Sequence, residues 1–230
     1  MKKFNQCSFG EPAYLPVRVE ENGKRFYASA VGKFPSITTV LSAVDNDWLE
    51  KWKESVGEEA AAAISRKATT IGTGLHSLCE HYLLNETSKV SKMRMSAMPE
   101  VKVRFDNFKS FLDKITDVYL LEAPVASSIL EIAGTVDCVA VYEGTLYVID
   151  FKTSNKQKQR SDIKSYFAQG SFYSYAIMEQ YGLKSPPKVL IAIATNGIKE
   201  PSIFIEEPKD HIAYVIEAKA KFNAKVNSDA

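Results

Sequence analysis

The sequence predicts a mixed α/β (α+β) fold with a mixed central sheet, flanking helices and an N-terminal helical lobe. Helical patterns dominate residues 36–115, whereas apolar and β-branched residues fill two adjacent segments at 131–142 and 145–153. A helical segment at 165–181 then separates this hairpin from another apolar strand at 189–195. Neither a repeat nor a sharp linker is visible, so the 230 residues are expected to form one domain.

The first segments are expected to form a hairpin and two short helices. Residues 17–28 alternate around an Asn-Gly dipeptide, which is typical of a two-residue hairpin turn. Ser36 is a candidate N-cap for a helix that continues to Val44. Residues 45–52 offer another helix start and then show the apolar spacing of a helix.

The helical lobe is expected to continue with three more segments. The alanine-rich run at 58–66 strongly favours a helix, and the IGTG sequence at 71–74 is expected to interrupt it. A helix then resumes at 75–84. Residues 88–95 are interpreted as a mobile basic linker, and residues 100–115 as a helix with phenylalanines on one face.

The second half alternates strands and helices. The polar, basic stretch at 153–164 lacks periodicity and is interpreted as a loop. The helix at 165–181 is expected to end at Gly182, because glycine is the usual residue after a helix C-terminus. The remaining expected elements are strands at 118–126, 189–195 (continuously apolar and therefore central) and 202–206, and a closing helix at 209–226.

The central hairpin brings charged residues together. With a two-residue turn at 143–144, Asp137 faces Asp150 across the pair, and Lys152 lies on the same side as Asp150. Like charges directly opposite each other destabilise a sheet, and buried charges are costly unless they are paired or bound to a metal. A divalent cation between the two aspartates would remove this conflict.

Composition excludes several classes of protein. The chain is 45% hydrophobic with a net charge of +1, so any basic surface for nucleic acid must be local. No apolar run is long enough for a membrane span, and the N-terminal residues resemble neither a secretory signal nor a transit peptide. Cys7, Cys79 and Cys138 favour neither a disulfide framework nor an iron–sulfur cluster. A reducing cytoplasm is the expected location.

Five motifs in order resemble the PD-(D/E)XK nuclease superfamily, and in particular its RecB-like branch. They are PSIT at 35–38, GTGLH at 72–76, GTVD at 134–137, IDFKTS at 149–154 and QGSFY at 169–173. This order is similar to that of the mitochondrial genome maintenance exonucleases and related phage and bacterial exonucleases. The resemblance implies a restriction-endonuclease-like sheet and the cytoplasm of a bacterium or a phage-infected host.

The resemblance also assigns roles. It divides the single domain into a hairpin and helical lobe at 1–116 and a catalytic core at 117–230. It implies Mg²⁺ or Mn²⁺ as the cofactor and Lys152 as the residue that orients the attacking water, or deprotonates it if its pKa is depressed. The implied metal ligands are His76, Asp137, Asp150 and the carbonyl of Phe151.

Other candidate residues each have a simpler interpretation that stays open. Gln169 and Tyr173 share a helix face and are assigned to catalysis or DNA binding, although packing explains a tyrosine equally well. Glu122, in the acidic strand, is a candidate for metal, water or structural support. Glu80 lies one turn beyond His76 and is either a partner of the imidazole or a solvated carboxylate. The candidates for contact with DNA are the loop residues Lys156, Lys158 and Arg160 and the aromatic residues Trp48, Trp52 and Tyr166.

The sequence therefore predicts a metal-dependent DNA exonuclease that acts on free ends, with single-stranded DNA as the partner, in replication, repair or recombination. A DNA endonuclease built on the same core is the first alternative. The second is a non-catalytic DNA-binding accessory protein, which the presence of Asp137, Asp150 and Lys152 disfavours. An ATPase is disfavoured because the chain has no phosphate-binding GxxxxGK[ST] loop.

Overall fold

A computed structural model describes residues 2–21, 24–44 and 52–228. The strands are β1 (Asn5–Gln6), β2 (Val17–Glu21), β3 (Lys24–Ser29), β4 (Gly32–Pro35), β5 (Ile115–Ser127), β6 (Ile132–Tyr142), β7 (Thr145–Ser154), β8 (Lys188–Thr195) and β9 (Ser202–Glu206). The helices are α1 (Ile37–Ser42), α3 (Glu58–Leu83), α4 (Thr87–Ser96), α5 (Pro99–Leu112), α6 (Lys164–Tyr181) and α7 (Ile212–Ser228), with 3₁₀ turns η1 (Arg160–Ile163) and η2 (Pro208–Asp210). None of these helices is long and apolar enough to cross a membrane.

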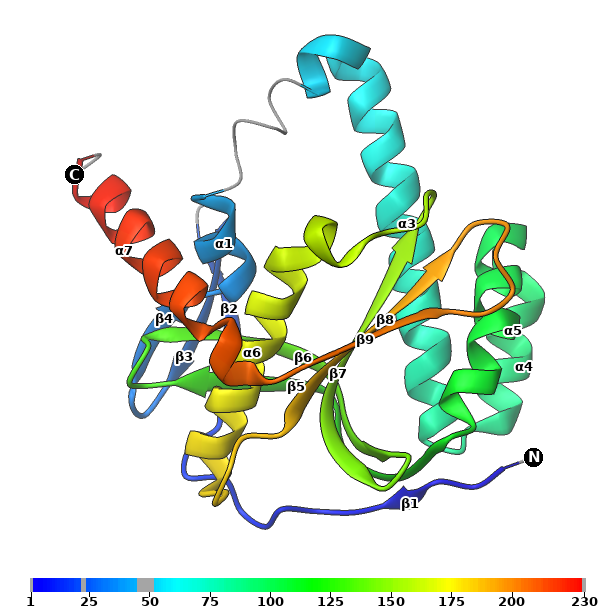
Figure 1. The fold of residues 1–230 in the computed structure, drawn as a ribbon, viewed down its shortest axis with the longest axis horizontal. Coiled ribbons are helices and arrows are strands. Elements are labelled where there is room, and N and C mark those ends of the chain that lie inside the picture. Colours follow the sequence, from blue (N-terminus) through cyan, green and yellow to red (C-terminus); the bar gives the residue numbers. More distant parts are fainter. Residues whose placement is uncertain (1, 22–23, 45–51, 229–230) are drawn as a thin grey trace.

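The predicted fold class is confirmed, because a six-stranded mixed sheet forms the centre of the molecule (Figure 1). Its strand order is β1-β5-β6-β7-β8-β9. The strands β5, β6 and β7 pair antiparallel, β7 and β8 pair parallel, and β8 and β9 pair antiparallel. The strand β8, expected to be central, has a neighbour on each side and is buried from Val189 to Thr195. The short strand β1, parallel to β5, was not predicted.

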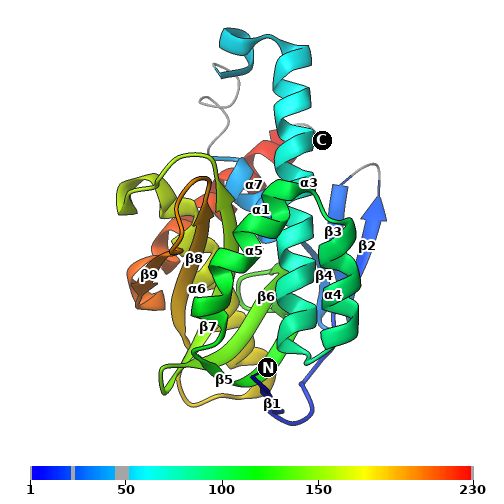
Figure 2. The ribbon, with the colours of Figure 1, turned by 90° about the vertical axis from the view of Figure 1, so that its right-hand side faces the viewer.

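Helices cover both faces of this sheet. The helices α3, α4 and α5 pack on one face against apolar residues such as Cys138, Ile149 and Phe151 (Figure 2). The helices α1, α6 and α7 pack on the other face against Val139 and Val148. Since successive strand residues point to opposite faces, β7 sends Ile149 and Phe151 toward α3 and Val148 toward α6.

The helix α3 is continuous, so the predicted interruption at 71–74 is wrong. Gly74 lies against α5, where an added Cβ would come within 3.0 and 3.1 Å of the two methyl groups of Val101. Glycine therefore serves close helix packing instead of a change of direction. The first half of α3 projects beyond the end of the sheet (Figure 1), and its residues from Glu58 to Thr70 are exposed except for Ala61.

The expected linker at 88–95 is also wrong, because these residues belong to helix α4. The segment has little helical amphipathicity of its own, so tertiary contacts account for its order. Val90 is buried in the core, and Arg94 forms an ion pair with Asp106 of α5. A local sequence pattern does not reveal contacts with residues that lie far away along the chain.

Most other predicted elements are confirmed. Ser36 caps α1 by accepting a hydrogen bond from the backbone N–H of Thr39, although the helix ends at Ser42 instead of Val44. Gly182 ends α6 in the left-handed conformation, with φ of 63°. The expected loop at 153–164 contains η1, and the closing helix starts at Ile212, after η2.

The small sheet β2-β3-β4 docks beside the main sheet. The predicted hairpin is confirmed by the pairing of β2 with β3, and β4 adds an unpredicted third strand. The turn at 22–23 and the start of the expected helix at 45–52, with Trp48, lie outside the described residues. Tyr27 and Phe34 pack on Ala126 and Ala133 of the main sheet.

Candidate active site

The β6–β7 hairpin ends at the candidate site. Its turn residues Glu143 and Gly144 both have positive φ, 47° and 81°, which confirms the predicted two-residue turn. The paired residues run from Tyr142–Thr145 to Cys138–Ile149 and stop there. The register is the predicted one, but the ladder does not extend to Asp137 and Asp150, and Asp137 Oδ2 accepts a hydrogen bond of 2.8 Å from the backbone N–H of Phe151.

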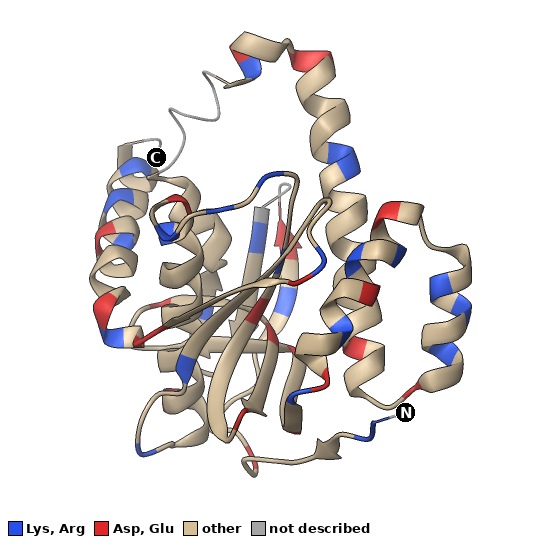
Figure 3. Ribbon diagram, turned by 45° about the vertical axis from the view of Figure 1, so that its right-hand side comes forward, with Lys and Arg blue, Asp and Glu red and all other residues tan. Residues whose placement is uncertain are grey.

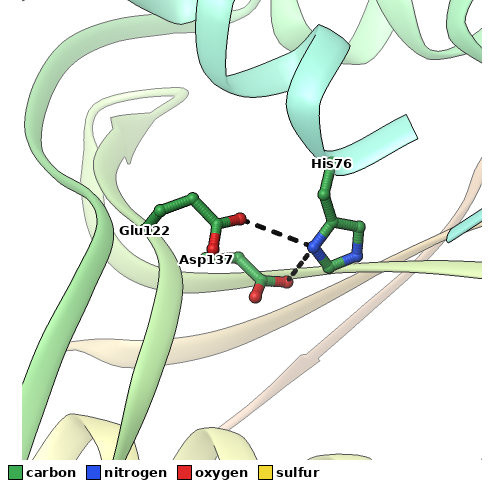
Figure 4. A group of neighbouring side chains, drawn as sticks. All are labelled: His76, Glu122 and Asp137. Atoms are coloured by element: carbon green, nitrogen blue, oxygen red, sulfur yellow. Dashed lines mark ion pairs between the residues drawn. The ribbon is translucent and has the colours of Figure 1, made fainter. Parts of the chain in front are cut away.

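Helix α3 brings His76 to the same place. His76 Nε2 lies 2.6 Å from the carbonyl oxygen of Phe151. Its other ring nitrogen, Nδ1, lies 3.6 Å from Glu122 Oε1 and 3.6 Å from Asp137 Oδ2 (Figure 4). Glu122 and Asp137 thus supply the carboxylates that face the imidazole, a role for which Glu80 was one of two interpretations.

Glu122 lies directly opposite Asp137 in the β5–β6 pair. The neighbouring pairs are Leu121–Cys138 and Ala123–Val136, so the two carboxylates face each other between them. Glu122 has φ of 43°, a left-handed conformation that is strained for a residue with a side chain. Two carboxylates opposite each other repel, and a strained backbone is typical of functional positions.

The side chains of His76, Glu122 and Asp137 can hold a metal ion. One ligand atom from each lies within 4.8 Å of the others, and the Phe151 carbonyl lies beside them. Carboxylate and carbonyl oxygens suit Mg²⁺, and an imidazole in the set also suits Mn²⁺. A cation would relieve the repulsion between the facing carboxylates, so this donor set fits the expected cofactor.

The carboxylates also determine the charge of the imidazole. Burial disfavours protonated His76, but the charge of Asp137 and the hydrogen bond to Glu122 prevail and raise its pKa to about 9. In the metal-free protein His76 is therefore a cation at neutral pH. It must lose a proton to bind a metal, since only the neutral imidazole is a ligand.

Asp150 and Lys152 form a buried ion pair next to this group. Asp150 is 2% exposed, as its apolar surroundings in the sequence predicted, and Lys152 Nζ lies 2.7 Å from its Oδ1 and 2.6 Å from its Oδ2. Burial raises the pKa of Asp150 to about 6, although Lys152 lowers it. Burial lowers the pKa of Lys152, but the charges of Asp150 and Asp137 prevail and raise it. The suggested depressed pKa of Lys152 is therefore wrong.

Helix α6 extends this pair into a chain of hydrogen bonds. Lys152 Nζ donates to Gln169 Oε1 over 3.4 Å, and Gln169 Nε2 donates to the Tyr173 hydroxyl over 3.2 Å. The Tyr173 ring fits against the backbone of Gly134, where an added Cβ would lie 2.8 Å from Tyr173 Cε1. Gln169 and Tyr173 thus converge on Lys152, as the shared helix face suggested.

A cavity of about 270 Å³ connects these groups with the small sheet. It is lined by His76, Glu122, Asp137, Lys152, Gln169 and Tyr173 and also by Arg18, Arg25, Tyr27, Ser36 and Thr38. The second set was missed in the sequence. The hairpin register contained a signal for three of them, because Arg18 pairs with Tyr27, and Arg25 shares the face of Tyr27.

Of the other candidates for DNA contact, the basic loop residues do not line this cavity, whereas Tyr166 lies beside Lys152. Arg160 forms an ion pair with Glu206, and neither Lys156 nor Lys158 lines the cavity. Tyr166 stands over Lys152, with its ring centre 5.2 Å from Nζ. Figure 3 shows basic and acidic residues interspersed over helices and loops in that view.

Comparison with known proteins identifies the family. The model of the PD-(D/E)XK nuclease superfamily matches residues 24–227, so the chain belongs to this superfamily. It is also similar to mitochondrial genome maintenance exonuclease 1. The identity is 30% over 132 residues in Mus musculus, 30% over 158 residues in Xenopus tropicalis and 30% over 133 residues in Homo sapiens.

These matches cover 54%, 63% and 54% of this chain but only 38%, 42% and 38% of the relatives. The matched region therefore spans about two fifths of the length of these curated relatives. The superfamily membership agrees with the five sequence motifs, and it makes a nucleic acid the expected class of substrate.

Proposed function

We propose that this protein is a metal-dependent DNA exonuclease of the RecB-like branch that hydrolyses phosphodiester bonds from the free ends of single-stranded DNA. The observation that carries the proposal is the convergence of His76, Glu122, Asp137 and Lys152 on one cavity. A cluster of acidic residues alone would be weak support. Lys152 lies beside this cluster, on the strand that also carries Asp150, and supplies the cationic group that hydrolysis of a phosphodiester needs.

The metal would be held by His76, Glu122, Asp137 and the carbonyl of Phe151. Bound there, Mg²⁺ or Mn²⁺ neutralises phosphodiester charge and lowers the pKa of a coordinated water. Asp150 as a further ligand stays a prediction, since both of its oxygens lie against Lys152. Its contact with Lys152 gives it a second role, which is to hold the ammonium group at the cavity.

Lys152 would position the attacking water and stabilise charge that develops on the phosphoryl oxygens. Its raised pKa keeps it protonated, so it acts as a cation and a donor and not as the base. Gln169 accepts from Lys152 and is itself held by Tyr173, which restricts where the ammonium group can move. Gln169 and Tyr173 are therefore assigned as positioning residues.

The surroundings of the cavity support a single strand as the substrate. Arg18 and Arg25 add positive charge opposite the carboxylates, where a DNA phosphate would enter. A cavity of about 270 Å³ has room for a phosphate and its sugar. The projecting half of α3 extends past the end of β7 and would restrict access from the side (Figure 2). The likeness to mitochondrial genome maintenance exonuclease 1 supports action at ends.

The test compares end-labelled linear single strands, linear duplexes and closed single-stranded circles in Mg²⁺, Mn²⁺ or chelator. We expect cleavage of linear single strands with either metal, none in chelator and none of the circles. Lys152→Met is the inactive control, and Lys184→Met, at an exposed lysine to which no role is assigned, is its active match. Rapid cutting of closed circles would replace the proposal by the endonuclease alternative, and wild-type activity of Lys152→Met would contradict the proposed site.

A further inference from the structure

We infer that a second cavity, between α3, α5 and the ends of β7 and β8, binds a phosphate group of the same nucleic-acid strand through Arg104. This inference rests on the proposed function and extends it to a second contact with the substrate. The cavity has a volume of about 220 Å³. Its polar lining comes from Lys67, Glu100, Arg104, Thr153, Ser154, Asn155 and Asn196.

Arg104 is a buried cation with neutral partners. It is 3% exposed, and its guanidinium donates to the carbonyl of Glu100 over 3.3 Å, to the carbonyl of Ser154 over 3.5 Å and to Oδ1 of Asn155 over 3.1 Å. Its Nε is buried and has no hydrogen-bond partner. A buried charge is costly unless an opposite charge accompanies it.

Within the part of the chain that the structure describes, the protein compensates that charge only in part, because the carboxylate of Glu100 attracts both Arg104 and Lys67. That carboxylate forms an ion pair of 2.9 Å with Lys67. Burial lowers the pKa of Arg104, yet a guanidinium stays protonated at neutral pH. An anion in the cavity would therefore compensate the charge, and a guanidinium can bind phosphate with two parallel hydrogen bonds.

The position of the cavity makes a phosphate of the substrate strand the fitting anion. Thr153 and Ser154, which line it, follow Lys152 directly in β7. Two residues along a strand advance roughly 6.6 Å, which is close to the separation of adjacent phosphates in an extended strand. Helix α3 contributes to both cavities, with Lys67 and Ile71 in one and His76 in the other. One strand can thus contact both.

The first experiment measures binding of a labelled single-stranded oligonucleotide to the full chain in chelator, where no cleavage occurs, over a range of salt concentrations. Each phosphate contact with a single strand contributes about 0.7 to the slope of log K against log salt. We expect Arg104→Met to reduce the slope by about 0.7 and to weaken binding roughly tenfold to a hundredfold. The control Arg94→Met removes an exposed cation, already paired with Asp106, and should leave the slope unchanged.

The second experiment replaces single phosphates of the oligonucleotide by neutral methylphosphonates, one position at a time. One internal position should weaken binding to the wild type but have no further effect in Arg104→Met. The assignment to the strand would be overturned if no methylphosphonate position weakened binding while inorganic phosphate raised the melting temperature only when Arg104 is present. Those two results together would show a site for free phosphate.

Folding of the variant is controlled separately. Arg104→Met removes a buried charge but leaves two backbone carbonyls and the Asn155 side chain without their donor, so its melting temperature without ligand should fall modestly. If this variant does not fold, Arg104→Lys decides, because it keeps the charge but loses the paired geometry. It should keep the salt slope and lose affinity, and unchanged affinity would refute the inference. Failure of the wild type to bind or cleave DNA would instead refute the proposed function.

Discussion

Replacing Lys152 by methionine tests whether this lysine neutralises the buried carboxylate of Asp150. Its Nζ lies 2.7 and 2.6 Å from the two oxygens of a side chain that is 2% exposed. Methionine has a similar length but no charge, so the carboxylate would lose its cation. We expect Lys152→Met to abolish cleavage and to destabilise the metal-free protein by an amount that depends on pH.

The size of this effect follows from the pKa of Asp150. Burial raises that pKa from 3.8 to about 6, although Lys152 lowers it. Without Lys152 the pKa rises further, so the variant keeps Asp150 protonated at a pH where the wild type ionises it. Below about pH 6 both proteins hold the proton, and the substitution adds no pH-dependent cost. Above it, the folded variant binds one proton more, and each pH unit removes about 1.36 kcal/mol of stability.

The pH-dependent loss should therefore be at most about 3 kcal/mol at pH 8. Urea denaturation in chelator at about pH 5.5 and at pH 8 measures it. Lys156→Met is the matched control, because Lys156 is exposed and lies four residues further along. The double variant Lys152→Met with Asp150→Asn should lose the pH dependence. An equal loss at both pH values, or none at pH 8, would refute the assigned partnership of Lys152 and Asp150.

Three more expectations address the rest of the site. Gly134→Ala places a Cβ 2.8 Å from Tyr173 Cε1, so it should lower the free energy of unfolding by roughly 1–3 kcal/mol and slow cleavage; wild-type stability in urea would contradict the packing. Gly72→Ala meets nothing within 4 Å and should instead stabilise α3 by about 0.5–1 kcal/mol, while a loss in the same assay would contradict a regular helix there. Binding of Mn²⁺ at pH 7 should release close to one proton, because the pKa of His76 is about 9 without metal and a ligand imidazole is neutral. Calorimetry in buffers of different ionisation enthalpy measures that release, and a heat independent of the buffer would exclude His76 as a ligand.

Local signals in the sequence predicted much of the fold. The hairpin turn at 143–144 and the cap residues Ser36 and Gly182 each depend on a few neighbouring residues, and the structure confirms all three. The continuity of α3 was not predictable in this way. Glycine costs a helix roughly 1 kcal/mol, and only the close approach of Val101 to Gly74 shows what the glycine provides.

The candidate site was predictable to the extent that it lies on one hairpin. The spacing of Asp150 and Lys152 in a single strand places them on one face. The position of Glu122 opposite Asp137 depends on irregular pairing in β5–β6, where the register shifts between Ile115 and Leu120. The contribution of the arginines at the cavity depends on how the small sheet docks. Neither feature has a local pattern, so both had to come from the structure.

Unfavourable features of this protein concentrate at the candidate site and call for two different remedies. The left-handed Glu122 faces Asp137, and a bound cation would offset that repulsion and stabilise the folded state according to its concentration and affinity. Asp150 is buried, and Lys152 is its partner in the structure. The gain in stability on adding Mn²⁺ should therefore depend on Asp137, whereas the loss of stability with rising pH should depend on Lys152. Measuring the effect of Mn²⁺ and the effect of pH in variants of Asp137 and Lys152 distinguishes the metal-binding half of the site from the half that holds the ammonium group.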